Sequence, residues 1–198
     1  MHQTAIILMG RSGCGKGTQG TLLSEYLKKN SNEKRVLYLQ SGSELREFIA
    51  HDGVTQRFAK EIYDRGDLEP EFLMIYMWAN RMIQSYTGGE HLIIDGTPRK
   101  VHEAGVLHSL FGFYNLSKPF VVYINVPKST SVERLLARGR GDDHKEEIEE
   151  RLTWFDSNVI PTIEYYRNNP HYNFIEINGD RPIDVVHADI VEHIAKFS

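Results

Sequence analysis

The chain contains the stretch Gly10-Arg11-Ser12-Gly13-Cys14-Gly15-Lys16-Gly17-Thr18, directly after a short apolar run at residues 5–9. An apolar run followed by G-x-x-x-x-G-K predicts a buried strand, a loop that binds phosphate, and then a helix over residues 16–29. Glycines let backbone N–H groups approach phosphate oxygens, and the N-terminus of the helix is partially positive. Lys16 adds a charge that can follow a phosphoryl group during transfer. The alternative, a glycine-rich turn that binds nothing, does not account for the strand and the amphipathic segment on either side.

The composition is that of a globular protein with one domain. Its 198 residues are 40% hydrophobic and 25% charged, and 27 acidic against 23 basic side chains give a net charge of −4. Such a chain is not expected to coat nucleic acid, so any basic site has to be local. No apolar stretch approaches the roughly 20 residues that span a bilayer, and the apolar run at the N-terminus lacks the flanks of a secretory signal. The single cysteine, Cys14, excludes an internal disulfide and a multi-cysteine zinc site. We expect a cytoplasmic monomer that binds neither membranes nor nucleic acid.

Strands and helices are predicted to alternate along the chain. After the first helix, apolar and β-branched runs predict strands at residues 35–39, 91–95, 120–125 and 172–177. Helices are predicted at 41–64, with a break near 52–53, and at 70–86, 99–113 and 183–197. Another helix is predicted to begin at Ser129 or Ser131, and a long one after a capping box of Asp143 and Glu146. This alternation predicts a parallel sheet with helices on both faces.

Three helical segments carry apolar residues that we expect in the core. The segment 70–86 carries the stripe Phe72, Leu73, Ile75, Tyr76, Met77, Trp78, Met82 and Ile83. In the helix that follows Ser129, Leu135 and Leu136 are expected to point inward. The long helix after Asp143 carries a second stripe, and Pro161 is expected to kink it: Ile148, Leu152, Phe155, Val159, Ile163, Tyr166.

Four arginines lie close together in the sequence: Arg134, Arg138, Arg140 and Arg151. One interpretation is a solvated basic face paired with the acidic residues at 146–150. However, Arg134 and Arg138 are spaced i, i+4 and share a helix face, and Arg140 lies in a glycine-flanked loop that could fold over a site. Permanently charged, planar guanidinium groups suit an enzyme that has to offset the charges of two nucleotides. We therefore favour a phosphate-binding role for these arginines.

Asp95 and Arg99 follow the predicted strand at 91–95. Asp95 is in the position of a Walker-B acid, which can hold Mg²⁺ directly or through water, although an aspartate here can also simply begin a helix. Arg99 would emerge at the same edge of the sheet, where open α/β folds bind their ligands. Thr18 supplies the hydroxyl of the phosphate loop, so Asp95 and Thr18 are the candidate magnesium residues.

Nearly the whole chain resembles a short-form adenylate kinase, because its motifs occur in the same order as in that family. Gly-Lys-Gly-Thr-Gln at 15–19 is the family's form of the phosphate loop, and Ser41-Gly42-Ser43-Glu44-Leu45-Arg46 resembles its T-G-D-x-L-R segment. Asp95-Gly96-Thr97-Pro98-Arg99 is similar to D-G-F-P-R, and residues 133–139 are similar to the segment that enters the lid. The resemblance implies an α/β P-loop NTPase fold with a five-stranded parallel sheet, in a single domain 1–198. Within it, the core covers 1–40, 70–138 and 144–198, a helical region that binds a nucleoside monophosphate (NMP) covers 41–70, and a short lid covers 139–143.

The resemblance also implies roles for individual residues. Arg134 would stack on the donor adenine, and the catalytic set would be Lys16, Arg99, Arg138, Arg140 and Arg151. The ATP site would consist of Gly13, Cys14, Gly15, Lys16, Gly17, Thr18 and Arg134. The NMP site would consist of Ser41, Gly42, Arg46, Gly66, Leu68, Glu69, Gly96, Arg99 and Glu103. The implied reaction is reversible, Mg²⁺-dependent transfer of the γ-phosphoryl group of ATP to AMP. It needs no general base, since an acceptor phosphate with a second pKa of about 6 is already ionised.

Several residues depart from the family pattern, and most of them lie in the acceptor region. Ser12 replaces a proline, Ser41 and Ser43 replace Thr and Asp, and Thr97 replaces Phe. Glu69 stands where the family has Val, and Glu103 where a glutamine reads the acceptor base. Ionised glutamate can only accept hydrogen bonds, which suits the donors of guanine better than adenine, unless Glu103 points to solvent instead. The alternatives to AMP are therefore another monophosphate (GMP, or CMP or UMP), a non-nucleotide acceptor, or a catalytically weak nucleotide-binding protein.

Overall fold

The computed structural model describes residues 3–31, 35–140 and 144–196, which contain one sheet of five parallel strands. Its strand order is β2-β3-β1-β4-β5. The strands are β1 (Ala5–Met9), β2 (Val36–Gln40), β3 (His91–Asp95), β4 (Phe120–Asn125) and β5 (Asn173–Asn178). Each predicted strand is present, displaced by at most one residue, so the predicted α/β fold is confirmed.

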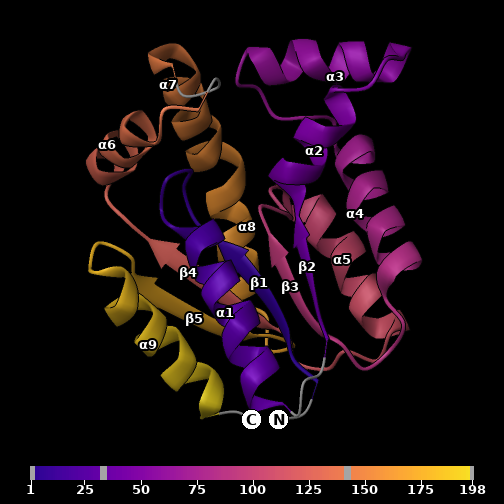
Figure 1. Cartoon of the computed structure of the whole chain (residues 1–198), viewed down its shortest axis with the longest axis vertical. Coiled ribbons are helices and arrows are strands. Elements are labelled where there is room, and N and C mark those ends of the chain that lie inside the picture. Colours follow the sequence, from indigo (N-terminus) through magenta and orange to yellow (C-terminus); the bar gives the residue numbers. More distant parts are fainter. Residues whose placement is uncertain (1–2, 32–34, 141–143, 197–198) are drawn as a thin grey trace.

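Helices cover both faces of this sheet (Figure 1). They are α1 (Lys16–Asn30), α2 (Ser41–Ile49), α3 (Val54–Asp64), α4 (Glu71–Ser85), α5 (Val101–Phe113), α6 (Lys128–Arg138), α7 (Lys145–Trp154), α8 (Ile160–Arg167) and α9 (Ile183–Ala195). A π-helical segment, η1 (Phe155–Val159), joins α7 to α8. Helices α1 and α9 pack on one face, and α4, α5 and α8 pack on the other.

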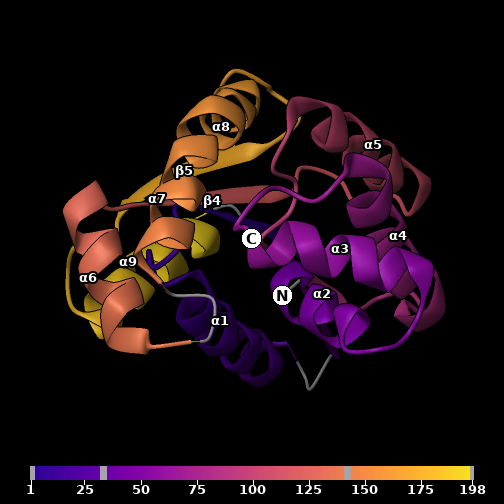
Figure 2. The same cartoon turned by 90° about the horizontal axis from the view of Figure 1, so that it is seen from above.

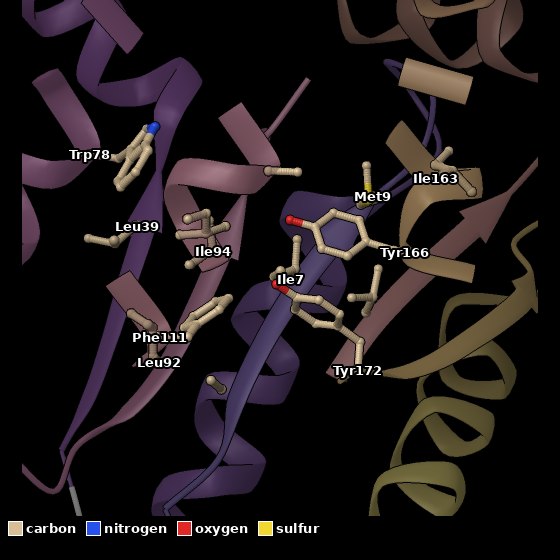
Figure 3. Close-up of a cluster of buried hydrophobic side chains, with 14 of the residues drawn as sticks. Ile7, Met9, Leu39, Trp78, Leu92, Ile94, Phe111, Ile163, Tyr166 and Tyr172 are labelled. Carbon is tan, nitrogen blue, oxygen red and sulfur yellow. The ribbon is translucent and has the colours of Figure 1, made fainter. Parts of the chain in front are cut away.

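Two apolar clusters fix this layered arrangement, because successive side chains of a strand point to opposite faces. Ile7 and Met9 of β1 belong to the cluster beneath α4, α5 and α8, where Trp78, Phe111 and Tyr166 fill the space over the sheet (Figure 3). The neighbouring Ile6 and Leu8 belong to the cluster under α1 and α9. Strand β1 is buried along its whole length, which fixes the position at which the phosphate loop begins.

Two of the expected core assignments are wrong in part. In α4, the side chains of Leu73, Met77, Trp78 and Met82 are buried, but Phe72, Tyr76 and Ile83 are 69%, 58% and 72% exposed. In α6, Leu135 is buried whereas Leu136 is 54% exposed. Both helices pack against the rest of the protein along one side only, so apolar residues on the far side stay exposed.

The long helix predicted after Asp143 is interrupted, but one turn earlier than its proline. All six residues of its apolar stripe are buried, as expected. The backbone widens into the π-helix η1, and Pro161 then lies in the first turn of α8. Proline has no N–H to donate and its ring clashes with the carbonyl four residues earlier, so a disturbed hydrogen-bond register is expected just before Pro161. The predicted cap residue Asp143 lies outside the described residues, and His144 is the N-cap of α7.

Helices α2, α3, α6 and α7 stand above the carboxyl ends of the strands (Figure 2). The predicted break near 52–53 separates α2 from α3, which form the helical insertion. Of the predicted lid at 139–143, only Gly139 and Arg140 are among the described residues. Within the described ranges, each helix is too short or too polar to cross a membrane.

Candidate active site

A cleft of about 1040 Å³ lies at the carboxyl ends of the strands, where open α/β sheets bind ligands. Its walls come from the loop after β1, from α2 and the turn before α4, from the end of β3, from α6 and α7, and from the residues after β5. The volume lies just above the range of roughly 300–1,000 Å³ typical of small-molecule pockets. A cleft of this size is suited to two ligands held end to end.

The loop after β1 has the conformation that its glycines predict. Gly15, with φ of 101°, is the N-cap of α1, and among the described residues no side chain caps the first N–H groups of this helix. A Cβ at Gly10 would stand only 2.4 Å from the carbonyl oxygen of Ile124, so the close approach of the loop to β4 requires glycine. Lys16 Nζ donates to the carbonyl oxygens of Gly10 and Arg11, at 2.6 and 2.9 Å. The lysine ammonium group and the open helix N-terminus thus lie on one anion-binding loop.

Two further residues of this loop make contacts that the motif does not predict. Arg11 donates to Asp156 Oδ1 at 2.8 Å, and its guanidinium carbon lies 4.5 Å from the centre of the Phe155 ring. Asp156 and Phe155 belong to η1, so the π-helix anchors the phosphate loop. Cys14 is 2% exposed and packs in the apolar cluster beneath α1 and α9, which means that its thiol faces the interior.

Asp95 ends β3 beside the phosphate loop, and both Asp95 and Thr18 line the cleft. The hydroxyl of Tyr38 donates to Asp95 Oδ2 at 3.3 Å. Burial raises the pKa of Asp95, and the charge of Lys16 opposes that shift. A hard divalent cation prefers carboxylate, hydroxyl and phosphate oxygens, so Asp95 and Thr18 have suitable chemistry for Mg²⁺.

Arg99 is held in place near Asp95, at the end of the same turn. Its Nε donates to the carbonyl oxygen of Gly96 at 2.8 Å, and its guanidinium carbon lies 5.1 Å from the centre of the Trp154 ring. Burial lowers the pKa of Arg99, and the nearby charge of Arg151 lowers it further, although the group stays protonated at any physiological pH. Two guanidinium groups that lie close together in a cleft form a strong site for a phosphoryl anion.

Glu103 does not contact the cleft, contrary to the expectation that it reads the acceptor base. It is 2% exposed, and its Oε2 accepts from the backbone N–H of Arg99 at 3.0 Å and from Thr97 Oγ1 at 3.2 Å. The alternative, in which Glu103 points to solvent, is also wrong. The carboxylate instead fixes the turn that carries Arg99, a role that its spacing in the sequence does not reveal.

The predicted arginines of the lid side converge on the same cleft. Arg134, Arg138, Arg140 and Arg151 all line it, the first two from one face of α6 as their i, i+4 spacing predicts. Arg134 Nη2 donates to the carbonyl oxygen of Gly179 at 3.1 Å, in the loop after β5. Arg151 of α7 is only 9% exposed, whereas most arginines in proteins are exposed to solvent.

Most of the other predicted site residues also line the cleft. These are Gly13, Cys14, Gly15, Gly17, Gly42, Arg46, Gly66, Glu69 and Gly96. Ser41 and Leu68 are not among its lining residues, and the Ser41 hydroxyl donates to the carbonyl oxygen of Asp95 at 3.2 Å instead. The cleft has further walls that sequence reasoning missed: Tyr63, Asp67, Trp154, Gly179, Arg181, Pro182 and Ile183. The residues after β5 were predictable in principle, because all parallel strands end at the same edge.

Comparisons with known proteins agree with this geometry. The family model for adenylate kinase matches residues 8–171. The chain belongs to the adenylate kinase family. It is 32% identical over 190 residues to an adenylate kinase of Prochlorococcus marinus (strain MIT 9515), with 96% of this chain and 98% of the relative covered. It is 31% identical over 195 residues to an adenylate kinase of Bacteroides thetaiotaomicron, covering 96% and 98%, and 33% identical over 165 residues to one of Nocardia farcinica, covering 81% and 84%. The chain is accordingly an ATP-dependent nucleoside monophosphate kinase.

Proposed function

We propose that this member of the adenylate kinase family transfers the γ-phosphoryl group of ATP to AMP, giving two molecules of ADP. The observation that carries the proposal is the convergence of two sets of groups in one cleft. Lys16 and the open N-terminus of α1 belong to the phosphate loop, which we assign to ATP, and we assign Arg46 and Arg99, which line the same cleft, to the acceptor. Arg138, Arg140 and Arg151 line the same cleft and supply the positive charge that two nucleotides require.

Mg²⁺ is the cofactor that this donor set fits. Asp95 presents a carboxylate in the cleft and Thr18 a hydroxyl, next to the loop that would hold the phosphates of ATP. Among the described residues, no three His, Cys, Asp or Glu side chains form a metal cluster, so nucleotide phosphates and water have to complete the coordination. When bound, Mg²⁺ would neutralise charge on the transferred group.

The protein residues perform the remaining steps by position and charge. Lys16 and the backbone N–H groups at the start of α1 hold the donor phosphates, and Arg46 and Arg99 hold the acceptor phosphate in line with them. The acceptor oxygen attacks the γ-phosphorus as the bond to the β–γ bridging oxygen breaks, and no proton has to move because the acceptor is already ionised. Arg138, Arg140 and Arg151 offset the charge that spreads over the transferred group in the transition state.

Exclusion of water requires that the two sides of the cleft meet. Trp154 Nε1 donates to the carbonyl oxygen of Gly66 at 2.9 Å, which joins the end of α7 to the turn before α4. Gly66 and Trp154 both line the cleft, so this contact ties two of its walls together. Closure of the walls over both nucleotides would favour transfer to the nucleotide over hydrolysis of ATP.

A coupled assay with MgATP and a panel of monophosphates (AMP, GMP, CMP, UMP) tests the proposal. We expect AMP to be phosphorylated, and we expect the Lys16→Ala variant to be almost inactive in the same assay. The retention of Lys16, Asp95 and the arginines argues against a catalytically weak binding protein. ATP hydrolysis without transfer to any monophosphate would refute the proposal.

A further inference from the structure

Glu69 is a buried carboxylate that the reaction described above does not use. It lies in the turn between α3 and α4, is 3% exposed, and lines the cleft. Neither Oε1 nor Oε2 has a hydrogen-bond partner among the described residues. Buried polar groups are nearly always hydrogen-bonded, because an unpaired one destabilises the folded state. An unpartnered carboxylate at the wall of a binding cleft therefore points to a ligand that donates hydrogen bonds.

The charges around Glu69 indicate which part of the acceptor it faces. Burial raises the pKa of Glu69 to about 7, whereas the charges of Arg99 and Arg65 oppose that shift and favour the ionised form. However, Arg65 Nε is paired with Asp67 Oδ2 at 2.9 Å, and Arg99 Nε donates to Gly96. A phosphate placed against Glu69 would be repelled, and the arginines of the cleft already provide its site. An uncharged part of the acceptor that donates hydrogen bonds therefore suits Glu69 better than its phosphate does.

Helices α2 and α3 supply an apolar wall of the cleft that suits a base. Leu45 and Tyr63 line the cleft and belong to one apolar cluster, which packs α2 and α3 against α4. Apolar and aromatic walls with a few polar groups are typical of sites that bind flat heterocycles. Glu69 is a polar group of this lobe that still lacks a partner, whereas Oε2 of Glu103, the other candidate, accepts hydrogen bonds from both Arg99 and Thr97.

We propose that Glu69 is a specificity-determining residue of the acceptor site, and that its carboxylate accepts hydrogen bonds from the N1–H and N2–H groups of guanine, so that the enzyme phosphorylates GMP as well as AMP. This inference rests on the proposed function. An ionised carboxylate has two acceptor oxygens and no donor, which matches the paired donors of guanine. Adenine offers one donor, N6–H, beside one acceptor, N1, and leaves the carboxylate half satisfied. The reaction with GMP is the same transfer, giving ADP and GDP.

The Glu69→Gln variant tests the proposal with little change of volume. The amide of glutamine donates one hydrogen bond and accepts another, which matches adenine and mismatches guanine. We expect the ratio of kcat/KM for GMP to kcat/KM for AMP, measured at pH 8, to fall at least tenfold in this variant. Glu71→Gln is the matched control, because Glu71 is a nearby carboxylate outside the cleft that pairs with His102 and Lys100. We expect the control to keep the wild-type ratio.

Two outcomes overturn different statements. If wild-type protein phosphorylates AMP and Glu69→Gln leaves the GMP-to-AMP ratio unchanged, then Glu69 does not read the base and the inference is wrong, while the proposed function stands. If wild-type protein phosphorylates no monophosphate, the proposed function itself is wrong. Activity of Glu69→Gln with AMP shows in the same experiment that the variant is folded. The Glu69→Val variant has no side-chain hydrogen-bonding group at this position, so its kcat/KM should also fall more for GMP than for AMP.

Discussion

Replacement of Glu103 by alanine should destabilise the protein without changing its choice of acceptor. The substitution removes the acceptor of two hydrogen bonds, from the Arg99 N–H at 3.0 Å and from Thr97 Oγ1 at 3.2 Å. Thr97 and Glu103 are 3% and 2% exposed, so water cannot easily replace the lost carboxylate. A buried donor without an acceptor costs about 1–3 kcal/mol, and the threonine hydroxyl can rotate, so we expect a total loss of about 3 kcal/mol.

Urea unfolding measures this loss directly. With an m-value of about 3 kcal/mol per molar urea for a chain of this size, the midpoint should fall by about 1 M. The turn that carries Arg99 also loses its anchor, so kcat/KM should decrease for AMP and GMP by the same factor. Glu103→Gln is the control, because its amide oxygen can take both hydrogen bonds and should change the unfolding free energy by less than about 1 kcal/mol. An unchanged midpoint in the alanine variant, or a shift in the AMP-to-GMP ratio, would show that Glu103 does not have this structural role.

Three further predictions follow from the site. Lys16→Ala and Arg99→Ala should each reduce turnover by on the order of a hundredfold, because we propose that both side chains bind phosphate in the transition state. Arg99→Ala should also lower the melting temperature, because it removes the hydrogen bond to Gly96 and the contact with Trp154. Near-normal turnover at saturating nucleotide contradicts the proposed role. Cys14, at 2% exposure, should react with a thiol reagent only as the protein unfolds, with or without ATP, and rapid modification of the native protein would contradict its burial. Burial raises the pKa of Glu69 from 4.5 to about 7, so this group makes the folded state less stable as the pH rises between those values. Between pH 5 and pH 8, the free energy of unfolding measured with urea should therefore decrease less in Glu69→Gln than in the wild type.

The fold was predictable because its core strands and their connections leave local signals. The apolar run before Gly10 can only be a short buried strand, and the glycine-rich loop after it begins a helix at Lys16 in the structure. The stripe from Ile148 to Tyr166 has helical spacing and is buried throughout. By contrast, α4 is apolar on nearly all sides, so periodicity cannot tell which side packs on the sheet, and Phe72 and Tyr76 were assigned to the core wrongly.

The charged residues of the site could be predicted from the sequence, because they belong to motifs that follow successive parallel strands. The arginines of α6 and α7 converge on the cleft as their spacing indicates. The roles of Glu69 and Glu103 could not be separated in this way, because both are single carboxylates next to turns. Only the position of their hydrogen-bond partners distinguishes them: Glu103 finds two donors within its own turn, and Glu69 finds none among the described residues.

Trp154 links the wall of the cleft that carries Arg99 to the helix that carries Arg151. Its ring lies beneath the guanidinium group of Arg99, its Nε1 binds the carbonyl oxygen of Gly66, and Arg151 is one turn earlier on the same helix. Gly66 has φ of 75°, and a Cβ there would stand 3.1 Å from Cα of Glu147, so the turn before α4 packs directly on α7. A larger residue at position 66 would separate these surfaces and move Trp154 away from Arg99. Arg99 and Arg151, which we propose to bind the acceptor and the transferred group, therefore belong to one connected set of contacts.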